Sequence, residues 1–416
     1  MPLHVSQEWP IWKIGPLSHL ARNVLCFLSP TPHGAPPDGN PRGNSYIFDN
    51  DDGAKLEDST GSKTMTAHSP MQFYTLDPMQ DSRWDDLVAS HPRASVFHQR
   101  GWLKSLANTY GYRPVVLTST PPGERLLDGI VFCEIKSWIT GSRMVSLPFA
   151  DHTDPLLNES GDAFYFTEWM RTERHKHNWK YIEIRPLFSE MHPDSSLAAS
   201  QSFWFHTLNL SPTLDEIFHQ FHKDCIQRRI RKAERERLTY ERGCSEGLVD
   251  DFYRLLMKTR RRHHLLPQPR AWFRNLVACM SPSVDIRVAR KDNIPIAAIL
   301  TLSHRRTVVY KYGCSDEEFH HLAGMPFLFW KLIEESKMAG AEQIDFGRTD
   351  LENDGLVRFK DQFGTIRSPL TYFRYSDGIR ENCVAAPAMP AARRLFSVLP
   401  DALSSRAGGL LYRHIG

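Results

Sequence analysis

The strongest constraint on the fold of this 416-residue chain is an internal repeat of predicted secondary structure. Each half is predicted to contain three antiparallel strands, a helix, a further strand, a variable loop and a last strand. The strand after the helix has a similar sequence in both halves, KYIEIR at 180–185 and EQIDFGR at 342–348. A repeat of about 150 residues indicates a duplicated domain and not a solenoid. We therefore expect two α/β (α+β) domains, each a mixed, mostly antiparallel sheet flanked by helices.

Hydrophobic periodicity places the expected elements along the chain. In the first half, helices are expected at residues 81–90, 102–110 and 164–177, and strands at 114–118, 129–135, 143–149, 181–185 and 203–208. In the second half, helices are expected at 214–222, 225–237, 247–263, 270–280, 324–338 and 354–362, and strands at 284–290, 296–302, 307–313, 343–346 and 370–375.

The beginning of the chain differs in composition from the rest. Pro, Gly, Asn, Asp and Ser crowd residues 29–69, and hydrophobic periodicity is missing there. Residues 1–70 are therefore expected to be disordered, or to precede a true start at Met65 or Met71.

The repeat also sets the expected domain boundaries. The first domain is expected at residues 71–210, the second at 211–378, and a C-terminal helical tail at 379–416. The tail combines basic and apolar residues. We expect its helix to pack on the second domain, with a peripheral membrane contact as the alternative.

Charge and cysteine usage narrow the function classes. Basic and acidic residues number 51 and 48, so the net charge of +3 gives no general affinity for nucleic acid, and we expect no DNA partner. The seven cysteines form no CxxC pair, which is typical of reduced thiols in a cytosolic protein and predicts no metal site. We expect a cytoplasmic protein, either free or at the inner face of the membrane.

One helix carries the strongest local concentration of positive charge. In the predicted helix 225–237, Ile226, Ile230 and Ala233 form a buried stripe. Another face is basic and consists of Arg228, Arg231, Lys232 and Arg235. The next helix repeats the design with Arg254, Lys258 and Arg261. Two such faces on adjacent helices can clamp a diphosphate, and the alternative is a solvated face with ion pairs.

Two further groups of side chains suit chemistry or binding. Asp151 and His152 follow the apolar strand 143–149, where either can take a proton from an attacking amine or serve as a turn residue. Tyr310 and Tyr312 alternate on strand 307–313, which predicts both hydroxyls on one face, for substrate contact or for core packing.

The order of elements resembles the core of the acetyltransferase (GNAT) superfamily, and several motifs are similar to those of the Fem transferases that build peptidoglycan bridges. These motifs are FHQRGW at 97–102, LPFADH at 147–152, RRIRKAER at 228–235, FGRTD at 346–350 and GLVRFKDQFG at 355–364. The resemblance covers residues 73–376 and is most specific to Fem-related proteins of bacterial exosortase and exopolysaccharide systems.

The resemblance implies roles for individual residues. Lys360, next to Phe359, is expected beside the reacting acyl group, where an ammonium stabilises an oxyanion. Arg229, Arg348, Asp350 and Phe359 are expected to bind substrate. Gly324 and Met325 lie between a strand and a helix, where acetyltransferases hold the pyrophosphate of coenzyme A, although a plain loop is the alternative.

The resemblance also implies the reaction. The donor is expected to be an acyl-CoA or an aminoacyl-tRNA acting as co-substrate, with no tightly bound cofactor. The acceptor is expected to be an amine on a nucleotide- or lipid-linked saccharide precursor. The contrasting hypothesis is a non-catalytic module that binds such a precursor, because one fold can serve many functions.

Overall fold

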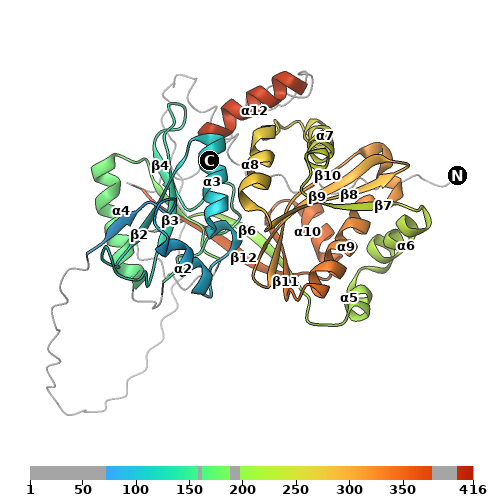
Figure 1. Ribbon diagram of the computed structural model, residues 1–416, viewed down its shortest axis with the longest axis horizontal. Coiled ribbons are helices and arrows are strands. Elements are labelled where there is room, and N and C mark those ends of the chain that lie inside the picture. The colour runs from blue at the N-terminus through green and yellow to red at the C-terminus, as the bar shows by residue number, and fades with distance from the viewer. Residues whose placement is uncertain (1–71, 158–161, 188–196, 377–400, 416) are drawn as a thin grey trace, which may run out of the picture.

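The computed structural model describes residues 72–157, 162–187, 197–376 and 401–415. Within them, all strands belong to one sheet of twelve strands with helices on both faces (Figure 1). The strand order is β1-β2-β3-β4-β5-β12-β6-β11-β10-β9-β8-β7. The predicted boundary at Met65 or Met71 lies outside the described residues.

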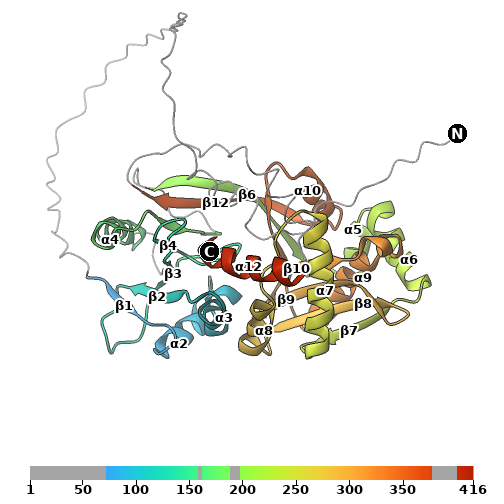
Figure 2. The same cartoon turned by 90° about the horizontal axis from the view of Figure 1, so that it is seen from above.

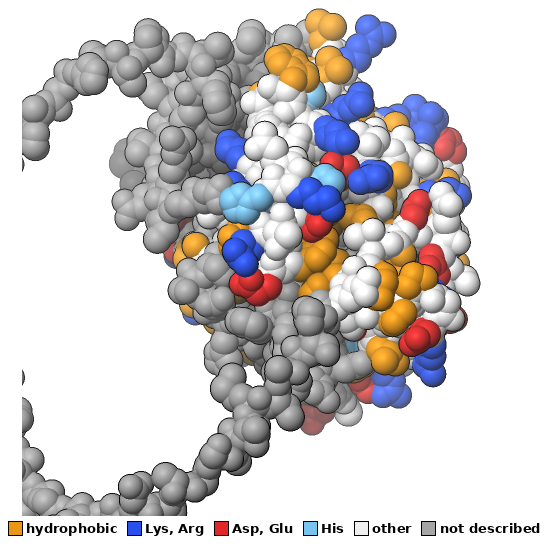
Figure 3. Space-filling model, turned by 90° about the vertical axis from the view of Figure 1, so that its left-hand side faces the viewer, with side chains coloured by type: hydrophobic (Ala, Val, Ile, Leu, Met, Phe, Trp, Pro, Cys, Tyr) orange, Lys and Arg blue, Asp and Glu red, His pale blue; other side chains and the backbone are white. Residues whose placement is uncertain are grey.

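The first half follows the predicted order and adds a short edge strand. Its elements are β1 (Tyr74–Leu76), α2 (Arg83–Ser90), η2 (Val96–His98), α3 (Arg100–Tyr110), β2 (Arg113–Thr118), β3 (Ile130–Ile135), β4 (Arg143–Val145), α4 (Asp162–His177), β5 (Ile182–Ile184) and β6 (Ala198–Asn209). Figure 3 looks onto the outer side of this half, where basic side chains are interspersed with acidic and hydrophobic ones.

The second half repeats this order and adds helices. Its elements are α5 (Leu214–Gln220), η3 (Lys223–Gln227), α6 (Arg228–Arg235), β7 (Thr239–Gly243), α7 (Glu246–Arg262), α8 (Arg270–Met280), β8 (Val284–Lys291), β9 (Ile294–His304), β10 (Thr307–Ser315), η4 (Glu317–Leu322), α9 (Gly324–Met338), β11 (Gln343–Asp350), α10 (Asp354–Asp361) and β12 (Ile366–Tyr375). A final helix, α12 (Asp401–Ile415), follows. Among the described residues, no helix is both long and apolar enough to span a membrane.

The two halves exchange their last strands. β6, the last strand of the first half, pairs with β11 of the second half. β12, the last strand of the second half, pairs with β5 of the first half, and β6 and β12 also pair with each other. A division at residues 210/211 therefore follows the chain order but cuts through the hydrogen-bonded sheet. Separating the halves would break backbone hydrogen bonds on both exchanged strands.

Opposite faces of the second-half strands pack against different helices. Because side chains alternate along a strand, Val309 packs with α7 and α8, whereas Val308 packs with α6 and α9. The predicted stripe of Ile226, Ile230 and Ala233 is buried on the α9 side of the sheet.

The C-terminal helix contacts both halves and not the second half alone, contrary to the prediction. Figure 2 shows α12 lying across the junction. On the first half, the Tyr112 hydroxyl donates to the Tyr412 carbonyl at 2.9 Å, and the buried Arg143 donates to the last carbonyls of α12. On the second half, the Tyr412 hydroxyl donates to the Leu266 carbonyl at 3.3 Å. The helix thus holds the two halves together.

Candidate active site

Two parallel strand pairs, one in each half, separate soon after they begin. β10 and β11 pair only between residues 307–309 and 343–345, although both strands continue beyond this point. β4 and β5 pair only between residues 144–145 and 182–183. Where parallel strands separate, backbone polar groups need other partners, so loops, side chains or ligands can enter. The polar side chains described next gather between these two points.

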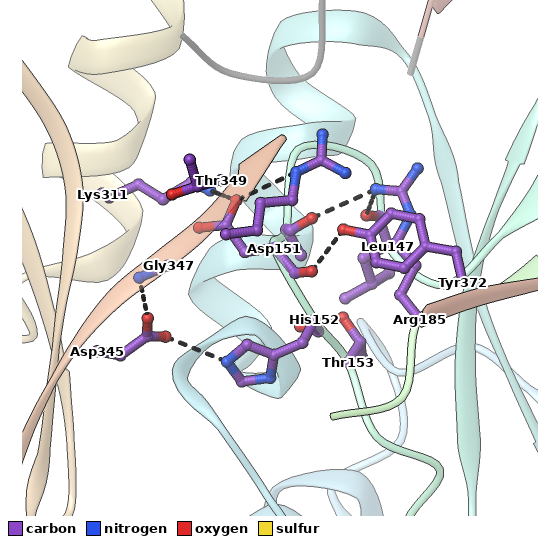
Figure 4. A network of polar contacts seen from close by, with 12 residues as sticks. Leu147, Asp151, His152, Thr153, Arg185, Lys311, Asp345, Gly347, Thr349 and Tyr372 are labelled. Carbon is purple, nitrogen blue, oxygen red and sulfur yellow. Dashed lines mark hydrogen bonds and ion pairs between the residues drawn. The ribbon is translucent and has the colours of Figure 1, made fainter. Parts of the chain in front are cut away.

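The loop after β4 brings Asp151 and His152 to the junction of the halves (Figure 4). The backbone N–H of Thr153 donates to the Arg185 carbonyl at 2.7 Å. The Arg185 guanidinium donates back to the Leu147 carbonyl, also at 2.7 Å. These bonds fix the backbone on both sides of Asp151 and His152.

His152 forms an ion pair with a carboxylate of the second half. Its Nε2 lies 3.1 Å from Oδ2 of Asp345, and the other Asp345 oxygen accepts from the N–H of Gly347. The rings of Phe97 and Phe205 meet the imidazole at 84° and 81°. The residue is 6% exposed, and its Nδ1 has no hydrogen-bond partner among the described residues.

The electrostatic surroundings favour the protonated form of His152. Burial by itself lowers the pKa of the imidazole, but the hydrogen bond to Asp345 and the charges of Asp345, Asp154 and Asp151 raise it, and the net shift is upward. The imidazole therefore exchanges its proton above the ordinary pKa of histidine.

The Asp151 carboxylate contacts basic side chains from two strands of the second half, β10 and β11. Its Oδ1 lies 3.2 Å from Nζ of Lys311 on β10 and 4.0 Å from Nε of Arg348 on β11. Its backbone carbonyl accepts from the Tyr372 hydroxyl. We call Asp151, His152, Lys311, Asp345 and Arg348 the junction network. In each of these ion pairs, the acidic group and the basic group come from opposite halves.

The predicted residues Asp151, His152 and Arg348 therefore lie together, while Lys311 and Asp345 were missed. The one sequence feature that pointed to Asp345 is the similarity of KYIEIR to EQIDFGR, which places Asp345 at the position of Glu183. Nothing in the sequence separated Lys311 from the residues around it. Within the described residues, no group of three metal-ligating side chains occurs.

Tyr310 and Tyr312 do not share one face, so that prediction is wrong. A β-bulge lies between them in the pairing of β10 with β9, and the extra residue, Lys311, reverses the alternation. The Tyr310 ring lies 4.7 Å from Phe329 on the α9 side. The Tyr312 hydroxyl accepts from Nε1 of Trp272 on the other side, at 2.9 Å.

Lys360 is fully buried on α10 and holds the end of β11. Its Nζ donates to the carbonyls of Gly347 and Arg348 at 2.9 and 3.0 Å, and to Oγ1 of Thr349 at 2.6 Å. The neighbouring Phe359 packs among the aromatic rings beneath α9. Lys360 thus lies beside the junction network, and its assigned action on an oxyanion stays a prediction.

The expected clamp between two basic helix faces is wrong. α6 packs on the α9 side of the sheet and α7 on the opposite side, so the sheet separates them. Arg228 pairs with Asp224 at 2.8 Å on the exposed surface. Arg231 is exposed and lies 5.3 Å from the centre of the Phe218 ring. Figure 1 places α6 far from the junction.

Of the remaining predicted binding residues, those on α6 and α7 are outside the junction network, whereas Asp350 lies beside Arg348 on β11 and its charge acts on that guanidinium. Lys232 is partly exposed on α6, and Arg261 is exposed at the end of α7. Arg229 is half-buried on α6, and desolvation lowers the pKa of its guanidinium. Asp350 ends β11. Their roles in binding stay predictions.

Gly324 and Met325 begin α9, after Ala323 in a left-handed conformation. Both are buried. A Cβ at Gly324 would lie 3.0 Å from the Cβ of Ala297, so the glycine permits close packing of the helix on the sheet. This packing explains the small residue without a bound donor, and the expected contact with coenzyme A stays a prediction.

Comparisons with known proteins agree with this architecture. Residues 221–361 match the family model of the acetyltransferase (GNAT) domain. The structure of FemX aligns with a TM-score of 0.56 at 13% identity, over 74% of this chain and 97% of FemX. The fold prediction of tandem GNAT domains is thus confirmed.

Two other structures are similar at lower scores. A tandem GNAT protein from the clavulanic acid biosynthesis pathway aligns with a TM-score of 0.46 at 10% identity, covering 74% of this chain and 99% of that protein. L-PGS from Bacillus licheniformis aligns with a TM-score of 0.44 at 14% identity, covering 64% and 84%. None of the curated proteins matches the chain in sequence.

Proposed function

We propose that the protein is an acyltransferase that moves an acyl or aminoacyl group to an amine of a cell-wall or exopolysaccharide precursor. The match to the GNAT domain and the FemX-like fold support the class of reaction. The observation that carries the proposal is the His152–Asp345 pair, which joins the two halves where the parallel strands separate.

The pair has the arrangement of a general base. Because Nε2 of His152 faces a carboxylate oxygen, we assign the imidazole proton to Nε2. Nδ1 then keeps a lone pair that can accept a proton from an amine. Asp345 orients the ring and stabilises the imidazolium that forms. The burial of the pair keeps water from competing for the proton.

The proposed reaction needs no covalent enzyme intermediate. The amine nitrogen attacks the acyl carbonyl carbon, a C–N bond forms, and the carbonyl oxygen becomes an oxyanion. The amine proton passes to Nδ1 of His152 as the bond to the donor breaks, and the imidazolium then protonates the departing thiolate or ribose oxygen. We propose Lys360 as the group that stabilises the oxyanion, and Arg348 and Phe359 as substrate contacts. The donor is an acyl-CoA or an aminoacyl-tRNA.

A binding module without catalysis is the second candidate. It is favoured by the way polar side chains at the junction contact one another, since Lys360 donates three hydrogen bonds to β11 and Lys311 pairs with Asp151. Such a module would bind a nucleotide- or lipid-linked saccharide precursor and turn nothing over.

The test is a turnover assay on the full-length protein. Acetyl-CoA and an aminoacyl-tRNA are offered in turn with amino-sugar nucleotides, and products are identified by mass spectrometry. His152→Ala should lower turnover about 100- to 10,000-fold, the range for loss of a general base. His91→Ala is the matched control, because His91 is also 6% exposed but its ring contacts the Leu157 carbonyl and no member of the junction network. Equal turnover in both variants would refute the assignment, and precursor binding without turnover would favour the module.

A further inference from the structure

The C-terminal end of α7 carries buried basic side chains that the proposed reaction does not use. Arg260 is 3% exposed, and Arg262 and His263 are partly buried. Each has one buried nitrogen without a hydrogen-bond partner among the described residues: Nη1 of Arg260, Nη2 of Arg262 and Nε2 of His263. We call these three residues the α7 cluster.

Such groups are normally paired, because an unpaired charge in the protein interior is costly. The charge of Arg260 acts on Tyr312, Cys314 and Tyr412, none of which is a carboxylate. Arg260 forms no ion pair among the described residues. The α7 cluster therefore lacks an anion at its most buried position.

The carboxylates near Arg262 do not replace that anion. Asp316 and Glu317 both act on its guanidinium. Asp316, however, forms an ion pair with Lys258, which lies on α7 together with Arg262. Glu317 is exposed to solvent. Within the described parts of the chain, Arg262 forms one hydrogen bond, from Nη1 to the Ser315 carbonyl at 3.3 Å. Its positive charge is thus only partly balanced.

The groups are close enough to influence one another. Burial first, and then the charges of Arg262 and Arg260, lower the pKa of His263 to about 4. His320 on η4 is affected in the same way, to about 4, by burial and by Arg262. Its Nε2 lies 2.9 Å from the Ser315 hydroxyl, which fixes it at the end of β10. Arg262 and His320 therefore both contact Ser315, where β10 ends, and Arg260 and His263 lie beside Arg262 at the end of α7.

We infer that the α7 cluster binds a phosphate group. A phosphate carries about −1.5 to −2 charges at neutral pH and three acceptor oxygens. It therefore matches the two guanidinium groups, each with an unpaired N–H donor, whereas a carboxylate has one charge and two oxygens. Arginine binds phosphate through two parallel N–H donors. That this phosphate belongs to a substrate rests on the proposed function, since the donor and the saccharide precursor both carry phosphate.

Binding is measured by calorimetry on the full-length protein, so the test does not depend on turnover. The probes are inorganic pyrophosphate, coenzyme A and uridine diphosphate. Arg262→Gln should weaken the bound probe at least about tenfold, the usual effect of losing a hydrogen bond to a charged group. Arg260→Gln should do the same, and the partly exposed Arg262 keeps the test valid if the Arg260 variant does not fold. Arg254→Gln is the control, because Arg254 lies on the same helix but is exposed and paired with Asp251.

The probes distinguish the source of the phosphate. Loss of coenzyme A binding alone assigns the α7 cluster to the donor, and loss of uridine diphosphate binding alone assigns it to the acceptor. Loss of pyrophosphate binding alone supports a phosphate site while separating it from the proposed substrates. If no probe binds at millimolar concentration, or if Arg262→Gln binds every probe as tightly as Arg254→Gln, the inference is wrong.

Discussion

The two halves of the molecule use equivalent strand ends differently. In the first half, Glu183 and Arg185 lie on and directly after β5, and the carboxylate contacts both Arg185 and Arg374 at 2.7 Å. In the second half, the equivalent pair is Asp345 and Arg348 on β11. A bulge between Asp345 and Gly347 inserts one residue, as the longer EQIDFGR motif requires. The guanidinium of Arg348 therefore no longer reaches its own strand's carboxylate.

This difference separates a structural ion pair from one suited to chemistry. Burial disfavours the Glu183 carboxylate, but Arg374 and Arg185 outweigh it and lower the pKa of Glu183 to about 2. The carboxylate thus stays charged and exchanges no proton near neutral pH. Asp345 instead contacts His152, whose pKa is raised by this carboxylate and its neighbours above the ordinary histidine value. The first-half carboxylate, Glu183, therefore stabilises the fold. The equivalent second-half carboxylate, Asp345, is paired with a histidine of the first half.

The largest effect is expected from neutralising the first-half carboxylate. Glu183→Gln leaves Arg185 and Arg374 without their anion, and removing one member of a buried pair costs about 3–5 kcal/mol. The free energy of unfolding from urea titration should fall by that amount. Turnover per folded molecule should change little. A stable Glu183→Gln protein with lost turnover would reverse the roles that we assign to the two halves.

A smaller effect is expected from Lys360→Met, which acts only on the second half. The carbonyls of Gly347 and Arg348 lose their donor, and unsatisfied buried acceptors cost about 1–3 kcal/mol. The unfolding free energy should fall by about 2 kcal/mol. If Lys360 also stabilises the oxyanion, turnover falls about 100-fold or more while ligand binding falls less. Unchanged turnover at lowered stability would limit Lys360 to holding β11.

The smallest effect is expected from Arg374→Gln. Its side chain is one-quarter exposed, and Arg185 continues to neutralise Glu183 in the variant. The loss should be about 1 kcal/mol, near that of a partly exposed ion pair. If the free energy of unfolding fell as much as in Glu183→Gln, Arg374 and not Arg185 would be the residue that neutralises Glu183.

Much of the fold followed from local patterns, but the site depended on tertiary geometry. The repeat gave the order of strands and helices because periodicity is a local property of the chain. It did not give the exchange of β6 and β12, since both strands suit either partner. The two tyrosines of β10 were placed on one face because the bulge at Lys311 has no clear sequence signal. Asp151 and His152 were found from their place after a strand, but their partners come from residues about 160 and 190 positions away.

The central claim is that His152, held by Asp345, accepts the proton of the attacking amine. The direct test is the pH dependence of kcat/KM in the wild type and in Asp345→Asn. The base must be neutral to act, so kcat/KM should rise with pH through the raised pKa of His152, above its ordinary value of 6.5. In Asp345→Asn, burial dominates and lowers the pKa, so the rise should move to lower pH while the maximal rate falls. A rise at the same pH in both proteins would contradict the claim.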